Sequence, residues 1–293
     1  MPVLLHLYDA HLHFHFEALA PHHAAIDADL RTAGLRQAVV NGTSEEEWAV
    51  VARLAKQYGW ILPSYGIHPW DCGNRSPDWL EKLREALTAT DSTGVGLPTE
   101  AVAAVGEIGL DRWIIDGVKP GDPRIAGLRV APMDEQCEVF GAQLALAAEL
   151  NRAASIHCVQ AFGVLADVLR SAKLPARGFL LHGYTGPAEM IQLFTKLGAY
   201  FSFNIQLLEP RHASRLENFR HIPADRLLVE TDAPTKAPAL ERNRYPLGHG
   251  ADGTAINHPA NIVVTYETLA ELRSLSLEAL AEQVEQNFTR LFL

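Results

Sequence analysis

The sequence predicts an α/β fold: a TIM (β/α)8 barrel with insertions at its C-terminal face. Short apolar or β-branched runs alternate with longer segments of helical period along the chain, and this alternation is typical of βαβ units around a parallel sheet. The chain has 293 residues, which fits a barrel of about 250 residues with insertions. We therefore expect one domain over residues 1–293.

Eight segments have the length and composition of strands: residues 4–8, 37–40, 61–67, 102–108, 153–156, 178–181, 199–203 and 227–230. Amphipathic helices are predicted between and after them, at residues 22–33, 44–58, 77–90, 133–150, 160–171, 187–197, 211–219, 259–273 and 276–288. Ser44, followed by three glutamates, is the expected N-cap of its helix.

A doubly wound sheet is the competing fold, but the glycine-rich turn expected after its first strand is missing, because residues 9–13 read Asp-Ala-His-Leu-His. Segments 113–131 and 235–258 are rich in Gly and Pro and lack apolar period. Both follow predicted strands, so we expect insertions on the catalytic face that act as lids or substrate walls.

Composition excludes some classes of protein. The 25 basic and 35 acidic residues give a net charge of −10, which argues against a broad basic surface that grips long nucleic acid, although metal ions can still hold a substrate phosphate. The three cysteines form no disulfide or CxxC pattern. No apolar stretch is long enough for a membrane span, and the first residues lack a signal pattern. We expect a cytoplasmic protein that does not bind membranes.

Imidazoles and carboxylates gather near the C-terminal ends of the predicted strands, which meet at one mouth in a barrel. Seven such side chains without a cation would be costly to bury together. They are His11, His13, His68, Glu107, His157, His182 and Asp232.

His11 and His13 are two residues apart, so on an extended backbone their side chains point to the same side and can bind one ion. The alternative is a half-buried strand with surface histidines. His157 and His182 are weaker candidates individually, and their repetition at two neighbouring strands favours a ligand role.

Glu107 lies in an apolar strand and needs a partner, either a metal ion or a basic residue such as Arg112. Alternation places Glu230 and Asp232 on one side of the last strand, with Asp232 nearer the mouth as ligand and general base and Glu230 behind it. His68, in a Gly-x-His-Pro turn, either steadies a substrate oxygen or bonds the local backbone.

The chain resembles the TatD-like metal-dependent hydrolases, many of them deoxyribonucleases, within the amidohydrolase-like superfamily. Six motifs carry the resemblance, in the family's order: Asp-Ala-His-Leu-His at 9–13, Gly-Ile-His-Pro at 66–69, Val-Gly-Glu-Ile-Gly-Leu-Asp at 105–111, Ile-His at 156–157, Leu-His-Gly-Tyr-Thr-Gly at 181–186 and Glu-Thr-Asp-Ala-Pro at 230–234. The end of the chain, 287–292, is similar to the family's final helix.

This resemblance implies a TIM barrel with one to two divalent ions (Mg, Mn or Zn) at its mouth. His11, His13 and Asp232 would hold one ion, His157 and His182 the second, and Glu107 would bridge them. Water activated by the ions, with Asp232 removing its proton, would attack phosphorus or a carbonyl carbon. The expected substrate is the end of a DNA or RNA strand, or else a small molecule. His68 would assist as a catalytic residue.

The chain departs from the family in part of the expected phosphate-binding set. The arginine that often follows the strand-five histidine is Val159 here, and valine cannot make the paired charged hydrogen bonds of arginine. For a nuclease, His68, Gln160, Lys236, Arg242 or Arg244 would have to replace it. Alternatives are therefore a hydrolase of a small ester, amide or lactone and a catalytically silent metal-binding protein.

Overall fold

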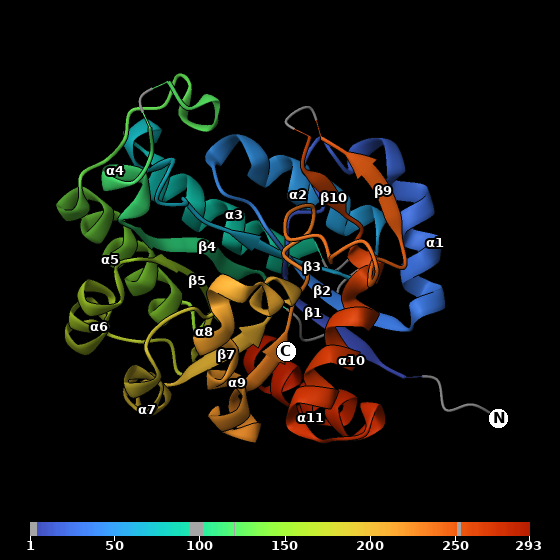
Figure 1. The fold of residues 1–293 in the computed structure, drawn as a ribbon. Coiled ribbons are helices and arrows are strands. Elements are labelled where there is room, and N and C mark those ends of the chain that lie inside the picture. Colours follow the sequence, from blue (N-terminus) through green and yellow to red (C-terminus); the bar gives the residue numbers. More distant parts are fainter. Residues whose placement is uncertain (1–4, 94–101, 120, 251–252) are drawn as a thin grey trace.

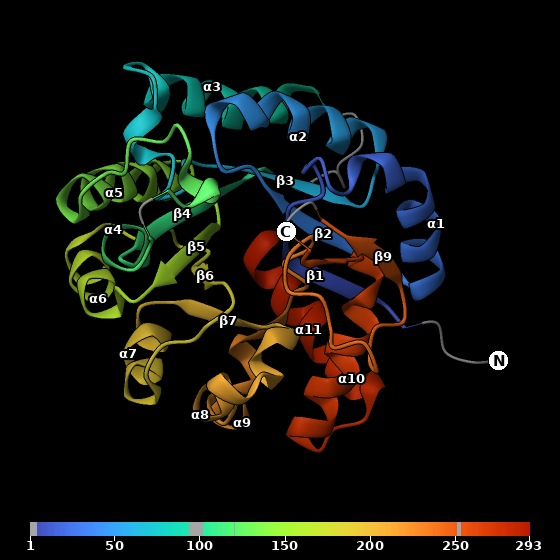
Figure 2. The same ribbon diagram turned by 45° about the horizontal axis from the view of Figure 1, so that its top comes forward.

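The computed structural model describes residues 5–93, 102–119, 121–250 and 253–293. Eight parallel strands pair in chain order, each with its neighbour in the sequence, and helices surround them (Figures 1 and 2). This arrangement confirms the predicted TIM barrel. The strands are β1 Leu7–Leu12, β2 Leu35–Asn41, β3 Ile61–Tyr65, β4 Ala104–Asp111, β5 Ala154–Val159, β6 Phe179–Leu181, β7 Ala199–Phe203 and β8 Leu227–Val229.

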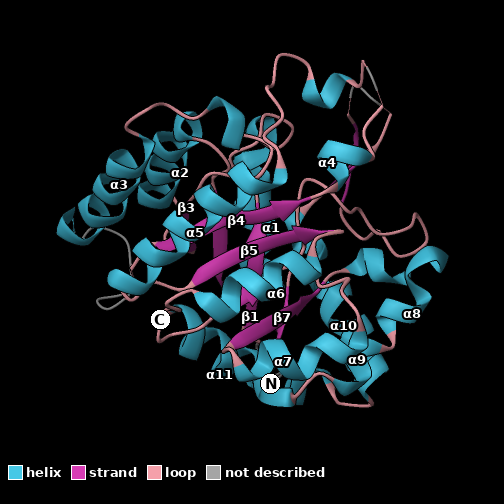
Figure 3. Ribbon diagram, turned by 90° about the vertical axis from the view of Figure 1, so that its left-hand side faces the viewer, coloured by secondary structure: helices cyan, strands magenta, loops and turns pink. Residues whose placement is uncertain are grey.

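The α-helices cover the outside of the strands (Figure 3). They are α1 His23–Ala33, α2 Glu45–Gln57, α3 Trp79–Thr93, α4 Trp113–Asp116, α5 Met133–Glu149, α6 Phe162–Ser171, α7 Ile191–Lys196, α8 Ala213–Leu216, α9 Asn218–His221, α10 Ile262–Arg273 and α11 Leu277–Phe292. Apolar side chains at helical spacing explain their docking, as in α11, where Leu280, Val284, Phe288 and Leu291 are all buried.

The first predicted strand is displaced in the structure. We predicted residues 4–8, of which residue 4 lies outside the described part, whereas β1 spans Leu7–Leu12 and contains His11. The apolar run ends at Asp9, but the strand continues because the Asp9 carboxylate accepts hydrogen bonds inside the barrel. Likewise, β4 runs to Asp111 rather than ending at 108, so Asp111 also lies on this strand.

One helix prediction was wrong, and the N-cap prediction was right about the position of Ser44 but not about a capping bond. The helix expected at 211–219 is two short helices, α8 and α9, and Asn218 Nδ2 in the second donates to the carbonyl of Gly186 in a neighbouring loop. Ser44 precedes α2 without a side-chain capping bond. The Glu47 carboxylate instead reaches back and accepts hydrogen bonds from the backbone N–H and Oγ1 of Thr43.

Both predicted insertions contain short regular elements. Segment 113–131 begins with α4 and contains a 3₁₀ turn at Pro123–Ile125, and residue 120 is not described. Segment 235–258 contains an antiparallel hairpin of β9 Pro246–His249 and β10 Ala255–Asn257. In Figures 1 and 2 the two insertions lie on opposite sides of the barrel.

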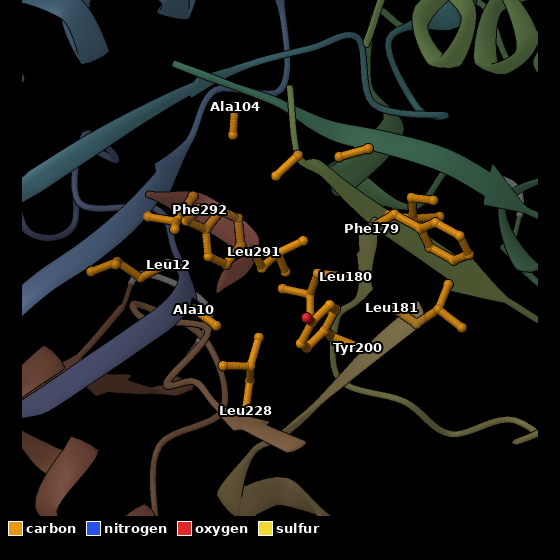
Figure 4. Close-up of a cluster of buried hydrophobic side chains, with 14 of the residues drawn as sticks. Ala10, Leu12, Ala104, Phe179, Leu180, Leu181, Tyr200, Leu228, Leu291 and Phe292 are labelled. Atoms are coloured by element: carbon orange, nitrogen blue, oxygen red, sulfur yellow. The ribbon is translucent and has the colours of Figure 1, made fainter. Parts of the chain in front are cut away.

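The apolar core is continuous between the strands and the enclosing helices. Figure 4 shows Leu291 and Phe292 at the end of α11 among Ala10, Leu12 and Leu228 from the first and last strands of the sheet. The C-terminal helix therefore packs where the sheet closes. No helix in the described ranges is both long and apolar enough to cross a bilayer.

Candidate metal centre

All seven side chains predicted for the site come together at the mouth of the barrel. His11 lies on β1 and His13 just beyond it, His68 follows β3, Glu107 is on β4, His157 is on β5, His182 follows β6 and Asp232 follows β8. Glu107 is at the centre, and its side chain is only 4% exposed.

The two oxygens of Glu107 face different groups of histidines. Oε2 lies 3.3 Å from Nε2 of both His11 and His13. Oε1 lies 2.9 Å from Nδ1 of His157 and from Nε2 of His182. Glu107 therefore stands between two imidazole pairs, the place of a bridging carboxylate.

The alternative partner for Glu107, Arg112, is not used. The Arg112 guanidinium is 41% exposed and its ion-pair partner is Asp116, at 3.7 Å. Gly109, with φ of +146°, lies where a Cβ atom would strike the backbone of His157. Glycine at this position lets β4 approach β5 closely enough to bring Glu107 to His157.

Neutral groups orient the first pair, His11 and His13. Nδ1 of His11 lies 2.9 Å from Ser155 Oγ and 3.1 Å from Asn41 Nδ2. Nδ1 of His13 lies 2.8 Å from the Asn41 carbonyl oxygen. Asp232 completes this side, with Oδ1 3.6 Å from Nε2 of His13.

Carboxylates face the second pair, His157 and His182. Nε2 of His157 lies 3.2 Å from Asp111 Oδ2, and Nδ1 of His182 lies 3.6 Å from Glu230 Oε1. Ser202 Oγ and Asn204 Nδ2 donate hydrogen bonds to the buried Glu230. Glu230 thus lies behind His182 rather than at the centre.

His68 bonds the local backbone with one ring nitrogen and faces the centre with the other. Its Nδ1 accepts a hydrogen bond of 3.2 Å from the backbone N–H of Trp70, as a structural turn residue would. Its Nε2 lies 3.5 Å from Glu107 Oε1 and so faces the centre.

Three overlapping groups place one potential ligand atom from each residue within 4.8 Å of the others: His11, His182 and Asp232; His11, His13 and Glu107; His68, Glu107 and His157. The first group joins His182 to His11 and Asp232, whereas the resemblance assigns His182 to the second ion with His157. Because Nδ1 of His157 is also 3.3 Å from Nε2 of His182, the ligand candidates form one continuous cluster.

Comparisons with known proteins identify the family. The family model described as TatD related DNase matches residues 8–293. The chain belongs to this TatD family. It is 28% identical to the uncharacterized metal-dependent hydrolase YabD of Bacillus subtilis, over 98% of each chain, and 30% identical to the 3'-5' ssDNA/RNA exonuclease TatD of Pantoea vagans, over 89% of this chain and 90% of the relative.

Among solved structures, the chain is similar to YjjV, a TatD homologue from Escherichia coli, with a TM-score of 0.79 and 26% identity, over 98% of this chain and 97% of that one. These findings confirm the resemblance, the barrel fold and the expectation of a metal-dependent hydrolase.

The electrostatics of the centre fit the cations that the TatD family implies. Burial would raise the pKa of Glu107, but the imidazoles around it, with His182 foremost, hold that pKa well below its usual value. Burial opposes protonation of His157, yet Asp111 and Glu107 raise its pKa to about 9. The carboxylates around the second pair therefore favour positive charge there, which a bound cation would supply.

Burial lowers the pKa of His11, and the charge of His182 lowers it further. The neutral form of His11 is the one that binds a metal ion.

Sequence reasoning missed the residues that support this TatD-family centre. Asp111 belongs to the motif at 105–111 but has no predicted role there, and no role is predicted for Asn41, Ser155, Ser202 or Asn204. Ser155 precedes His157 by two residues on one strand, so alternation places both on the same side. Asn41 and His11 are 30 residues apart, so no local sequence pattern indicates their contact.

Asp9 connects the strands at the two ends of the sheet. Its carboxylate accepts hydrogen bonds from Thr231 Oγ1 at 2.5 Å and from the backbone N–H groups of Thr231 and His11 at 3.1 Å. The Asp232 N–H also donates to the His11 carbonyl at 3.0 Å. These bonds position Asp232 beside His11 and His13.

The residues that could replace the missing arginine contact to phosphate have different surroundings in the structure. Val159 lies two residues after His157 on β5 and is half-buried on the same side. Arg244 is held by Glu267 through two bonds of 2.7 and 2.8 Å, and Arg242 lies 3.5 Å from Thr268. Lys236 has no ion pair with any described carboxylate. Of the three basic candidates in that insertion, Arg244 is therefore the one whose charge is already paired with a carboxylate.

Proposed function

We propose that this chain is a divalent-metal-dependent phosphodiesterase that removes nucleotides from DNA or RNA ends. The observation that carries the proposal is the placement of Glu107 between two imidazole pairs, because a bridging carboxylate suits two cations that act on one phosphate. Relatives named as 3'-5' ssDNA/RNA exonucleases, at 30% identity, support nucleic acid as the substrate.

Each residue has a defined task in this proposal. His11, His13 and Asp232 would hold one ion, His157 and His182 would hold the second, and Glu107 would lie between them as a shared ligand. When bound, such ions polarise a phosphoryl oxygen and make water a stronger nucleophile at neutral pH. Asp232 accepts the proton of the attacking water, and Nε2 of His68 donates a hydrogen bond to a substrate oxygen.

The ligand set favours a transition metal. Four imidazoles with two carboxylates suit Zn²⁺ or Mn²⁺ better than Mg²⁺, which prefers oxygen ligands and retains water. We propose Zn²⁺ first, and metal analysis of the protein as purified tests this choice.

We also propose that the chain is one cytoplasmic domain. Cys72, Cys137 and Cys158 are all free thiols, as in proteins of a reducing compartment. Limited proteolysis tests the single domain, because a stable fragment containing only part of the barrel would contradict it.

Turnover by the metal-loaded protein decides the proposal. Single-stranded DNA with a free 3' end is compared with a panel of small phosphodiesters, esters and lactones. Release of mononucleotides that stops on chelation and resumes on adding metal supports the exonuclease. Turnover of an uncharged ester or lactone without cleavage of DNA or RNA would identify the small-molecule hydrolase instead. No turnover of any substrate by the fully loaded protein would favour a silent metal-binding protein.

A further inference from the structure

Two tryptophans lie against each other just outside the metal centre. Trp70 belongs to the loop after β3, and Trp113 is the first residue of α4, at the start of the 113–131 insertion. Their ring centroids are 5.9 Å apart, with 25° between the planes. Both side chains are half-buried, so this stacked pair is not part of the closed apolar core.

A chain of hydrogen bonds fixes this pair relative to the centre. Trp70 Nε1 donates to Asp111 Oδ2 at 2.7 Å, and the same oxygen lies 3.2 Å from Nε2 of His157. The other Asp111 oxygen accepts the Ile114 N–H at 3.2 Å, which holds the start of α4. One carboxylate therefore positions a candidate metal ligand and both aromatic rings.

The far end of the insertion is also anchored. Glu135 at the start of α5 pairs with Arg129 at 2.7 Å and with Arg75 at 2.6 Å. Arg129 Nε donates to the carbonyl of Gly73, in the loop that carries Trp70. The two segments that carry the stacked rings are thus joined at a second point.

Solvent-exposed arginine covers part of Trp113. The Arg124 guanidinium lies 4.7 Å from the ring centroid, and this side chain is 57% exposed while it also pairs with Asp122. A nucleobase that stacks on this face of Trp113 therefore has to take the place of the guanidinium, which Asp122 holds at 2.9 and 2.6 Å.

We propose that Trp70 and Trp113 form a stacking subsite for a nucleobase of the substrate strand, next to the phosphate that is cleaved. This inference rests on the proposed function. The Trp70 ring lies 6.0 Å from that of His68, which faces Glu107. The subsite is thus in the layer of side chains adjoining the metal centre, and a base next to a phosphate bound at that centre would reach it. Indole rings accept any base, and only an unpaired base offers its face.

Binding of a labelled single-stranded oligonucleotide to the metal-free protein tests the subsite without cleavage. We expect Trp113→Ala to weaken binding about 5- to 150-fold, the range for loss of one stacked base. Trp113→Phe should restore most of the affinity. Tyr245→Ala, which removes a partly buried aromatic from the other insertion, is the matched control and should bind like the wild type.

A second oligonucleotide, with abasic sugars at its last two 3' positions, separates stacking from a structural effect. The wild type should bind it about as weakly as Trp113→Ala binds the normal strand, and the variant should lose little more. The subsite proposal is wrong if Trp113→Ala prefers the normal strand to the abasic strand as strongly as the wild type does. If the metal-loaded wild type still cleaves DNA in that case, the proposed function stands, and if it neither binds nor cleaves any strand, both proposals are wrong.

Discussion

The two imidazole pairs at the mouth of the barrel differ in what lies behind them. The outer nitrogens of His11 and His13 contact a hydroxyl, a side-chain amide and a backbone carbonyl. Those of His157 and His182 face the carboxylates of Asp111 and Glu230. The first pair is held in place by neutral groups, and the second pair is held in place and made more basic.

This difference implies that the two imidazole pairs have different roles. A carboxylate behind a ligand histidine increases its basicity and strengthens metal binding. We infer that the second pair retains its ion more strongly through its supporting carboxylates, while the first pair, beside Asp232, is the side where the proton is removed.

The largest effect is expected at Asp232. Asp232→Asn should lower kcat about 100- to 10,000-fold, because the amide cannot accept the proton, and further if metal is lost. Glu230→Gln should be milder, because Glu230 lies behind His182. Steady-state kinetics with metal analysis checks both, and Asp225→Asn, at an exposed position, is the control. Equal losses in the two variants with metal retained would show that the base is misassigned.

Removing a ligand from the second pair should empty mainly one site. In His157→Ala and His182→Ala, elemental analysis should show one equivalent of metal fewer, since each variant lacks an imidazole on the same side of Glu107. His221→Ala, which removes a side chain that is 73% exposed, should keep the wild-type content. Unchanged occupancy in both variants would contradict the assignment of the second ion.

Loss of a charged supporting group should weaken metal binding more than loss of a neutral one. Asp111→Asn should weaken metal binding about 10- to 100-fold, as is typical of groups behind metal ligands. Ser155→Ala removes one neutral contact to His11 and should weaken metal binding less than Asp111→Asn does. Competition titrations with a metal-sensitive dye measure both. The comparison of the two pairs fails if the serine variant loses as much affinity as the aspartate variant.

The smallest effect concerns substrate choice. Val159→Arg should raise phosphodiesterase efficiency about tenfold, or ~1.4 kcal/mol of transition-state stabilisation, because the side chain lies on the same side of β5 as His157. On an uncharged ester the variant should gain nothing. Gln286→Arg adds the same charge at an exposed position of α11 and serves as the control. No gain on a dinucleotide would mean that residue 159 does not face the substrate.

The sequence predicts the barrel and brings the seven side chains to one mouth, because strand order and strand ends follow from local apolar patterns. It does not predict Asn41 or Ser202, whose contacts to His11 and Glu230 depend on how neighbouring strands align. The predicted end of the first strand at residue 8 was wrong because local hydrophobicity cannot show that Asp9 finds partners 222 residues away.

That contact between Asp9 and Thr231 has a consequence for biosynthesis. One side of the metal centre is built from the two ends of the sheet, so it cannot assemble until nearly the whole chain has left the ribosome. Such a distant pairing also slows folding, because a long loop must close before the contact forms. Unfinished or C-terminally truncated chains therefore lack the complete centre, which delays hydrolytic chemistry until the barrel has closed.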